Sequence, residues 1–177
     1  MIFSPAKPGD LDAVWRVYED AVPHQNRQGI DHWDANYPTK AIIADDIAER
    51  RCFIVRENGV TAAVLRLDSE QDPAYLDIEW RYGEPYVCVH RLCVHPGFQG
   101  NGLAKRIMLD VIALYKSEGY AAIRLDTYMP NRIAMRLYEG LGFERRGTVH
   151  FDGRGDRDFM CFEFDLAFGK PQVNEAK

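Results

Sequence analysis

A chain of 177 residues with 46% apolar and 28% charged side chains is long enough to bury a core without disulfides or metals. Its nine Tyr, nine Phe and three Trp exclude disorder along the whole chain. No apolar run reaches about 18 residues, which excludes a transmembrane helix, and the net charge of −5 argues against a protein that wraps nucleic acid. Residues 1–11 lack the apolar stretch of a signal peptide, so we expect a cytoplasmic location.

The cysteine pattern argues against cross-links and metal centres. No two of the four cysteines form a CxxC pair, and each lies in an apolar, strand-like segment. We therefore expect buried thiols rather than disulfides or zinc ligands, and no metal site. The four positions are Cys52, Cys88, Cys93 and Cys161.

Apolar periodicity and turn residues divide the first half of the chain. Thr39 can cap a helix, and Asn58-Gly59 is typical of a β-hairpin turn. In chain order we predict a helix over 10–27, an aromatic-rich loop over 29–39, a helix over 40–50, and strands over 52–56, 60–67 and 75–80.

The second half contains a strand, a glycine turn, an amphipathic helix and another strand within 86–126, which predicts a right-handed parallel βαβ unit. The flanking hairpins add antiparallel strands, so we expect an α/β fold with a mixed sheet and helices on both faces. One domain over 1–167 and a frayed tail over 168–177 complete the prediction. The elements are a strand over 86–94, a helix from 103 to Gly119, a strand over 121–126, a helix over 131–139, and strands over 143–151 and 159–166.

The glycine turn at 96–102 is a candidate anion site. The first amides of a helix lack intrahelical acceptors, and Gly100 and Gly102 let a phosphate approach the backbone closely. A tight turn without a ligand is the structural alternative. A Walker loop is absent, and Lys105 stands where the third small residue of a dinucleotide fingerprint belongs.

Two motifs carry more information together than either does alone. Residues 99–104 read QGNGLA and residues 131–143 read NRIAMRLYEGLGF. In this order and at this distance they resemble the (Arg/Gln)-x-x-Gly-x-(Gly/Ala) and N-x-x-A-x-x-x-Y-x-x-x-G-F motifs of the GNAT N-acetyltransferase superfamily. The segment 30–38 is similar to uncharacterised bacterial members. The resemblance implies a GNAT-like mixed, partly splayed sheet.

The resemblance also implies an acyltransferase that uses acetyl-CoA as co-substrate and transfers acetyl to a primary amine by direct attack in a ternary complex. The Leu92 N–H would polarise the thioester carbonyl, the Tyr138 hydroxyl would protonate the leaving thiolate, and Asn131 would hold the coenzyme arm. The implied coenzyme contacts are Leu92, Val94, Gln99, Gly100, Asn101, Gly102, Leu103, Ala104, Lys105, Asn131, Ala134 and Tyr138.

The general base is less well defined by the sequence. His90 lies two residues before Leu92, so a regular strand would place Cys88, His90 and Leu92 on one face, and histidine titrates near neutral pH. Glu79, on the strand predicted before it, is the second candidate, and a water relay is the third. Each residue also has a structural interpretation: His90 as a hydrogen-bonded strand residue and Tyr138 as a core aromatic.

For the acceptor pocket we expect Trp33, Tyr37 and Trp80, which could stack on an apolar or cationic amine, although both tryptophans could instead pack in the core. The sequence does not distinguish between amino acids, polyamines, antibiotics and protein amines as the acceptor. No nucleic-acid or membrane partner is expected, and a homodimer is compatible with the sequence. The alternatives are a catalytically silent acyl-CoA-binding regulatory module and a nucleotide-binding or interaction protein that uses the same turn.

Overall fold

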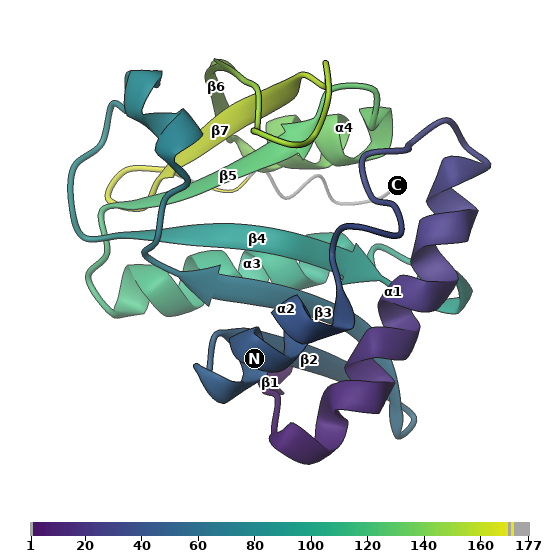
Figure 1. The fold of residues 1–177 in the computed structure, drawn as a ribbon. Coiled ribbons are helices and arrows are strands. Elements are labelled where there is room, and N and C mark those ends of the chain that lie inside the picture. Colours follow the sequence, from purple (N-terminus) through teal and green to yellow (C-terminus); the bar gives the residue numbers. More distant parts are fainter. Residues whose placement is uncertain (1, 170, 172–177) are drawn as a thin grey trace. The chain divides into compact units, whose positions relative to one another are not determined.

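The computed structural model describes residues 2–169 and 171 (Figure 1). Its strands form a seven-stranded sheet in the order β1-β2-β3-β4-β5-β7-β6, and the expected mixed, open α/β sheet is confirmed. The elements are β1 (Phe3–Pro5), η1 (Pro8–Asp10), α1 (Leu11–Asn26), α2 (Lys40–Ala48), β2 (Cys52–Glu57), β3 (Val60–Asp68), η2 (Pro73–Asp77), β4 (Tyr86–Val94), η3 (Pro96–Phe98), α3 (Leu103–Ser117), β5 (Ala122–Tyr128), α4 (Arg132–Leu141), β6 (Glu144–Val149) and β7 (Phe159–Asp165).

The strand predicted over 75–80 is wrong, because this segment begins with the 3-10 helix η2. The Asp72 carboxylate accepts a hydrogen bond from the Ala74 amide at 2.9 Å, and Pro73 occupies the first helical position. This Asp-Pro start signal outweighs the strand preference of the residues that follow. Glu79 therefore lies in an exposed loop rather than on a strand.

The chain forms two compact units. The first comprises Met1–Asp68 and Val89–Asp110. In this unit β1, β2 and β3 are antiparallel neighbours, with Phe3 opposite Val55 and Cys52 opposite Arg66. Helices α1 and α2 pack against each other and against these strands (Figure 1). Their shared core contains Val14, Val17, Tyr18, Ala21, Trp33, Ile43, Ile47, Ile54, Val64 and Cys93.

The second unit comprises Ser69–Cys88 and Val111–Lys177. Here β7 lies between β5 and β6 and is antiparallel to both, which confirms the closing antiparallel pair that the sequence predicts (Figure 1). A second apolar cluster contains Tyr75, Val149, Phe159 and Cys161, and the half-buried Trp80, Tyr128 and Phe151 pack on it. The single domain over 1–167 stays a prediction. Of the tail predicted over 168–177, residue 170 and residues 172–177 lie outside the described residues.

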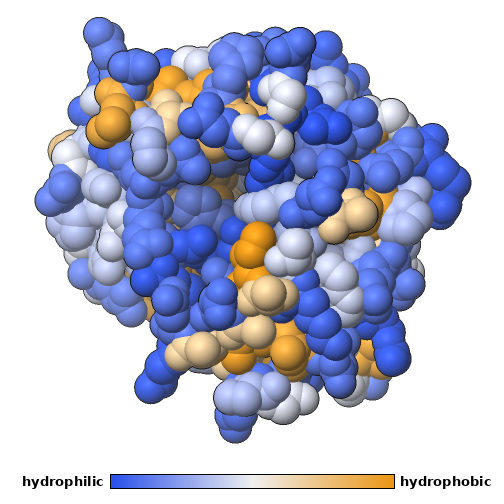
Figure 2. Space-filling view, in the orientation of Figure 1, coloured by the Kyte–Doolittle hydropathy of each residue, from blue (hydrophilic) through white to orange (hydrophobic). Residues whose placement is uncertain are grey.

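Figure 2 shows a largely hydrophilic face with small, separate apolar patches. No helix in the described part of the chain is both long and apolar enough to cross a membrane.

A fully buried carboxylate organises the second unit. Glu163 on β7 accepts hydrogen bonds from the side chains of Arg124 at 3.1 Å and Arg146 at 3.0 Å. It also accepts from the backbone amides of Arg81 at 2.8 Å and Tyr82 at 3.3 Å. The network therefore ties the segment before β4 to the sheet, and each partner compensates the buried negative charge.

We expect Glu163→Gln to lower the free energy of unfolding by about 3 kcal/mol, because two enclosed guanidinium groups lose their counter-charge. Glu144→Gln is the control, since its side chain is 46% exposed and also pairs with Arg146; it should cost less than about 1 kcal/mol. Urea denaturation measures both variants. Equal losses would contradict a special role for the buried carboxylate.

Candidate active site

The glycine turn leaves a series of backbone amides without acceptors. Gly100 and Gly102 have φ angles of +82° and +70°, a left-handed conformation that favours glycine. The first hydrogen bond of α3 runs from the Arg106 amide to the Gly102 carbonyl at 3.1 Å. Within the described residues, no amide from 100 to 105 has a backbone or side-chain acceptor. We call this series the amide cradle.

The amide cradle is open to a ligand. A Cβ atom built on Gly100 or Gly102 would meet no other atom within 4 Å. The amides lie at the N-terminus of α3, where the helix dipole is positive, and α3 spans 15 residues. Convergent N–H groups at the positive end of a helix suit a phosphate or diphosphate.

The structure distinguishes the two cations of the first helical turn. The Arg106 guanidinium pairs with Glu57 at 2.7 Å and donates to the Asn101 carbonyl at 2.8 Å, so it supports the turn itself. Lys105 is half-buried and makes no ion pair within the described residues. Lys105 is therefore the cation of this turn that remains available to an anion.

Two side chains hold the turn against β4. The Gln99 side-chain amide donates to the Val94 carbonyl at 2.9 Å. The His95 Nδ1 atom accepts from the Gly97 amide at 3.1 Å, and its Nε2 atom lies 3.0 Å from the Asp20 carboxylate. The sequence analysis missed His95, although a polar residue directly before a proline that opens a helix is a cap signal.

The backbone of β4 is irregular at Arg91, whose φ angle is +49°. A left-handed residue interrupts regular strand alternation between His90 and Leu92, so the regular strand on which the expectation for Cys88, His90 and Leu92 depends is not present there. The irregular residue directly precedes Leu92, the residue whose amide was predicted to polarise the thioester.

The structure places the two predicted bases in different environments. The His90 Nε2 atom lies 3.6 Å from the Asp68 carboxylate, which fits the structural interpretation of this histidine. Glu79 is exposed in its loop. Their roles as bases stay predictions.

Tyr138 lies on α4 and has a buried ring, packed 5.7 Å from the Phe143 ring and 5.8 Å from the Phe162 ring. Its hydroxyl makes no hydrogen bond within the described residues and is not fully enclosed. Burial raises the pKa of Tyr138, and the Asp126 carboxylate raises it further. The hydroxyl is therefore protonated at neutral pH and can donate a proton.

Asn131 caps the same helix, because its side-chain oxygen accepts from the Ala134 amide at 3.1 Å. This cap is a structural role for Asn131, and the coenzyme contact that the resemblance implies for it stays a prediction. Since α4 is a continuous helix from Arg132, Asn131 and Tyr138 are separated by about two turns, as their spacing predicts.

Asp126 is a candidate site residue that the sequence analysis did not select. It is half-buried on β5, and the hydroxyl of the buried Tyr75 donates a hydrogen bond to it. Its charge also acts on the Tyr138 hydroxyl. The signal in the sequence was a carboxylate at the C-terminal end of the strand predicted over 121–126.

The predicted acceptor residues fall in both units. Trp33 is 6% exposed and packs in the core of the first unit, 5.5 Å from the Tyr18 ring, which supports the structural interpretation of this tryptophan. In the same unit the Tyr37 hydroxyl accepts from Arg91 at 2.9 Å. Trp80 belongs to the second unit, is half-buried, and has the Arg124 guanidinium 4.7 Å from its ring centroid.

The cysteines are unbridged and buried, as predicted. Burial raises the pKa of Cys52 to about 12 and raises the pKa values of Cys93 and Cys161 strongly. Thiols that stay protonated inside a core are poor nucleophiles. Cys52, Cys93 and Cys161 are therefore poor candidates for a covalent intermediate.

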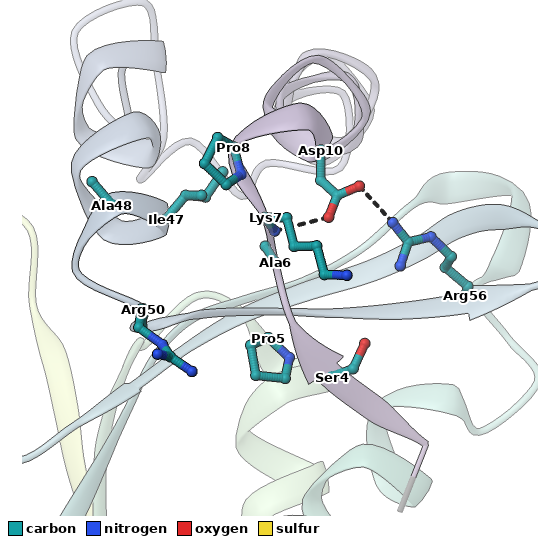
Figure 3. Close-up of a pocket in the computed structure, with 10 residues that line it drawn as sticks. All are labelled: Ser4, Pro5, Ala6, Lys7, Pro8, Asp10, Ile47, Ala48, Arg50 and Arg56. Atoms are coloured by element: carbon teal, nitrogen blue, oxygen red, sulfur yellow. Dashed lines mark hydrogen bonds and ion pairs between the residues drawn. The ribbon is translucent and has the colours of Figure 1, made fainter.

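A groove in the first unit lies apart from the predicted site residues. It runs along β1, η1 and the end of α2 (Figure 3). The Asp10 carboxylate there accepts a hydrogen bond from the Lys7 amide at 2.8 Å and pairs with Arg56 at 2.7 Å. None of the predicted site residues lines the groove. Its ten lining residues are Ser4, Pro5, Ala6, Lys7, Pro8, Asp10, Ile47, Ala48, Arg50 and Arg56.

The chain thus combines a mixed open sheet, a turn after β4 with unpaired backbone amides, and a buried tyrosine on α4. The family model "Acetyltransferase (GNAT) family" matches residues 12–143. The chain belongs to this family.

Individual proteins agree with this assignment. The chain is 27% identical over 151 residues to N-acetyltransferase family 8 member 2 of Rattus norvegicus, covering 80% of this chain and 63% of that protein. It is 22% identical to the spore coat polysaccharide biosynthesis protein SpsD of Bacillus subtilis, over 83% of this chain and 48% of that protein. The chain therefore spans less than two thirds of the length of each of these two relatives.

Solved structures show the same fold. A GNAT family acetyltransferase from Streptococcus agalactiae has a TM-score of 0.79 at 23% identity, over 91% of this chain and 92% of that one. The yncA protein from Salmonella typhimurium, solved with its cofactor acetyl-CoA, has a TM-score of 0.66 at 18% identity, over 99% of this chain and 95% of that one.

Proposed function

We propose that this chain binds acetyl-CoA and transfers the acetyl group to a primary amine by direct attack in a ternary complex. The observation that carries the proposal is the amide cradle, since unpaired amides from 100 to 105 fit the coenzyme diphosphate. Family membership and the acetyl-CoA bound to a structural relative support the choice of ligand.

Acetyl-CoA, when bound, supplies a thioester carbonyl that an amine can attack. We assign the diphosphate to the amide cradle, with Lys105 as the nearby cation and Gln99 supporting the turn. Leu92, Val94, Asn131 and Ala134 would hold the pantetheine arm through polar contacts. These are the coenzyme contacts that the resemblance to the family implies for this sequence.

Two proton transfers accompany the reaction. The Leu92 N–H stabilises the negative charge that develops on the carbonyl oxygen as the amine nitrogen forms its bond to carbon. When the carbon–sulfur bond breaks, the Tyr138 hydroxyl gives its proton to the sulfur. We assign the proton lost by the nitrogen to Asp126, directly or through one water, because this carboxylate belongs to the same unit as Tyr138 and its charge acts on the Tyr138 hydroxyl.

We expect Asp126→Asn to lower kcat by about 10²-fold and to change the shape of the pH–rate profile, because the amide cannot accept a proton. Asp77→Asn is the matched control, because it removes an exposed carboxylate two residues from Tyr75. It should keep the kcat and the pH–rate profile of the unchanged protein. Steady-state thiol release between pH 6 and 9 measures the effect. A profile that is unchanged in Asp126→Asn assigns the base to water or to another residue.

The overall proposal is tested by release of thiol from acetyl-CoA across a panel of amino acids, polyamines, aminoglycosides and peptides with a free N-terminus. Amine-dependent thiol release with formation of the N-acetyl product supports it. Tight coenzyme binding without turnover on any amine would favour the silent acyl-CoA-binding module. Equal binding of adenine nucleotides that lack the pantetheine arm would favour a nucleotide-binding protein.

A further inference from the structure

A buried polar network surrounds Arg91 in the first unit. We propose that Asp46, with Tyr18 and Tyr37, acts through Arg91 as a positioning residue that fixes the irregular backbone of β4 and so orients the Leu92 amide. The inference rests on the proposed function for the role of that amide, but the network itself is independent of the coenzyme.

The backbone of Arg91 is held from one side. The hydroxyl of Tyr18, a residue of α1 that is 3% exposed, donates to the Arg91 carbonyl at 3.1 Å. This carbonyl belongs to the peptide group whose nitrogen is the Leu92 amide. A bond to the carbonyl therefore fixes the plane in which the Leu92 N–H lies.

The side chain of Arg91 is held from two further segments. One guanidinium nitrogen donates to the Tyr37 hydroxyl at 2.9 Å, and the other pairs with the Asp46 carboxylate. Both members of the ion pair have side chains less than 10% exposed, at 7% and 8%. Asp46 also lies 3.6 Å from Arg66 on β3, so the carboxylate is enclosed between two cations.

The arrangement explains why a non-glycine residue adopts a φ angle of +49° here. Such a conformation persists only where the surroundings over-determine it. Hydrogen bonds from α1, the 29–39 loop and α2 converge on this one residue. Since a buried guanidinium needs its counter-charge, loss of the Asp46 charge should release the side chain and with it the backbone.

The first test compares Asp46→Asn with Asp45→Asn, which removes an exposed carboxylate from the neighbouring position of the same helix. We expect Asp46→Asn to lower kcat on the order of 10²-fold, since small misplacements of a reacting group have effects of this size. The affinity for coenzyme A should change by less than about threefold, because the amide cradle is intact. Asp45→Asn should have the same kcat and the same affinity for coenzyme A as the unchanged protein.

A second measurement needs no turnover. In ¹⁵N-labelled protein without ligand, the Leu92 amide resonance should shift in Asp46→Asn and in Tyr18→Phe, and stay in place in Asp45→Asn. Tyr18→Phe removes one hydroxyl only, so it tests the network if Asp46→Asn does not fold. An unmoved Leu92 resonance in the folded variants overturns the inference, as does an unchanged kcat in an active enzyme. Absence of activity in the unchanged protein would instead contradict the proposed function.

Discussion

Tyr138→Phe is expected to lower kcat by about 10²- to 10³-fold while the affinity for acetyl-CoA changes little, because one proton donor is lost and the ring stays in place. The Tyr138 ring contributes packing against Phe143 and Phe162, which phenylalanine keeps. Thiol release at saturating acetyl-CoA, with binding measured by calorimetry, separates the two quantities.

The pKa of Tyr138 sharpens this prediction. Burial and the charge of Asp126 raise it, so the hydroxyl stays protonated as the pH rises through 9 and the unchanged enzyme should not lose activity there through this group. Tyr120→Phe is the control, since Tyr120 packs edge-on against Tyr115 at 4.8 Å outside the proposed machinery. Full kcat in Tyr138→Phe would remove this residue from the mechanism.

Gly102→Asp is expected to weaken acetyl-CoA binding by at least 100-fold. A carboxylate a few ångströms from a diphosphate costs on the order of 3–4 kcal/mol at an effective dielectric constant near 20, and tenfold in affinity corresponds to about 1.4 kcal/mol. The new side chain would also occupy the open space over the amide cradle. Calorimetric titration with coenzyme A measures the loss.

Gly119→Asp is the matched control for the backbone. Gly119 ends the same helix with a φ angle of +79°, against +70° at Gly102, and a Cβ atom there also meets nothing within 4 Å. Aspartate tolerates the left-handed region better than most residues, so both variants should carry a similar conformational penalty. Equal coenzyme affinity in the two variants would place the diphosphate elsewhere.

Most of the fold could be predicted from local signals. Apolar periodicity located α1, α3 and α4, and Asn58-Gly59 located the β2–β3 turn, because each signal depends on residues only a few positions apart. The amide cradle could also be predicted, since two glycines and a following amphipathic helix determine its backbone almost alone.

Features that depend on distant residues could not be predicted in this way. The left-handed backbone at Arg91 requires Tyr18, Tyr37 and Asp46, which come from segments far apart in the sequence. Asp126 became a candidate through its hydrogen bond from Tyr75, a residue 51 positions earlier, and through its charge acting on Tyr138. Residue spacing along the chain cannot predict a hydrogen bond between positions so far apart.

A crystal structure of this chain with acetyl-CoA tests the central claim most directly. The account predicts oxygens of the coenzyme diphosphate within about 3 Å of the backbone nitrogens from 100 to 105, at normal hydrogen-bond distance. An ordered coenzyme whose diphosphate contacts none of these nitrogens would contradict it.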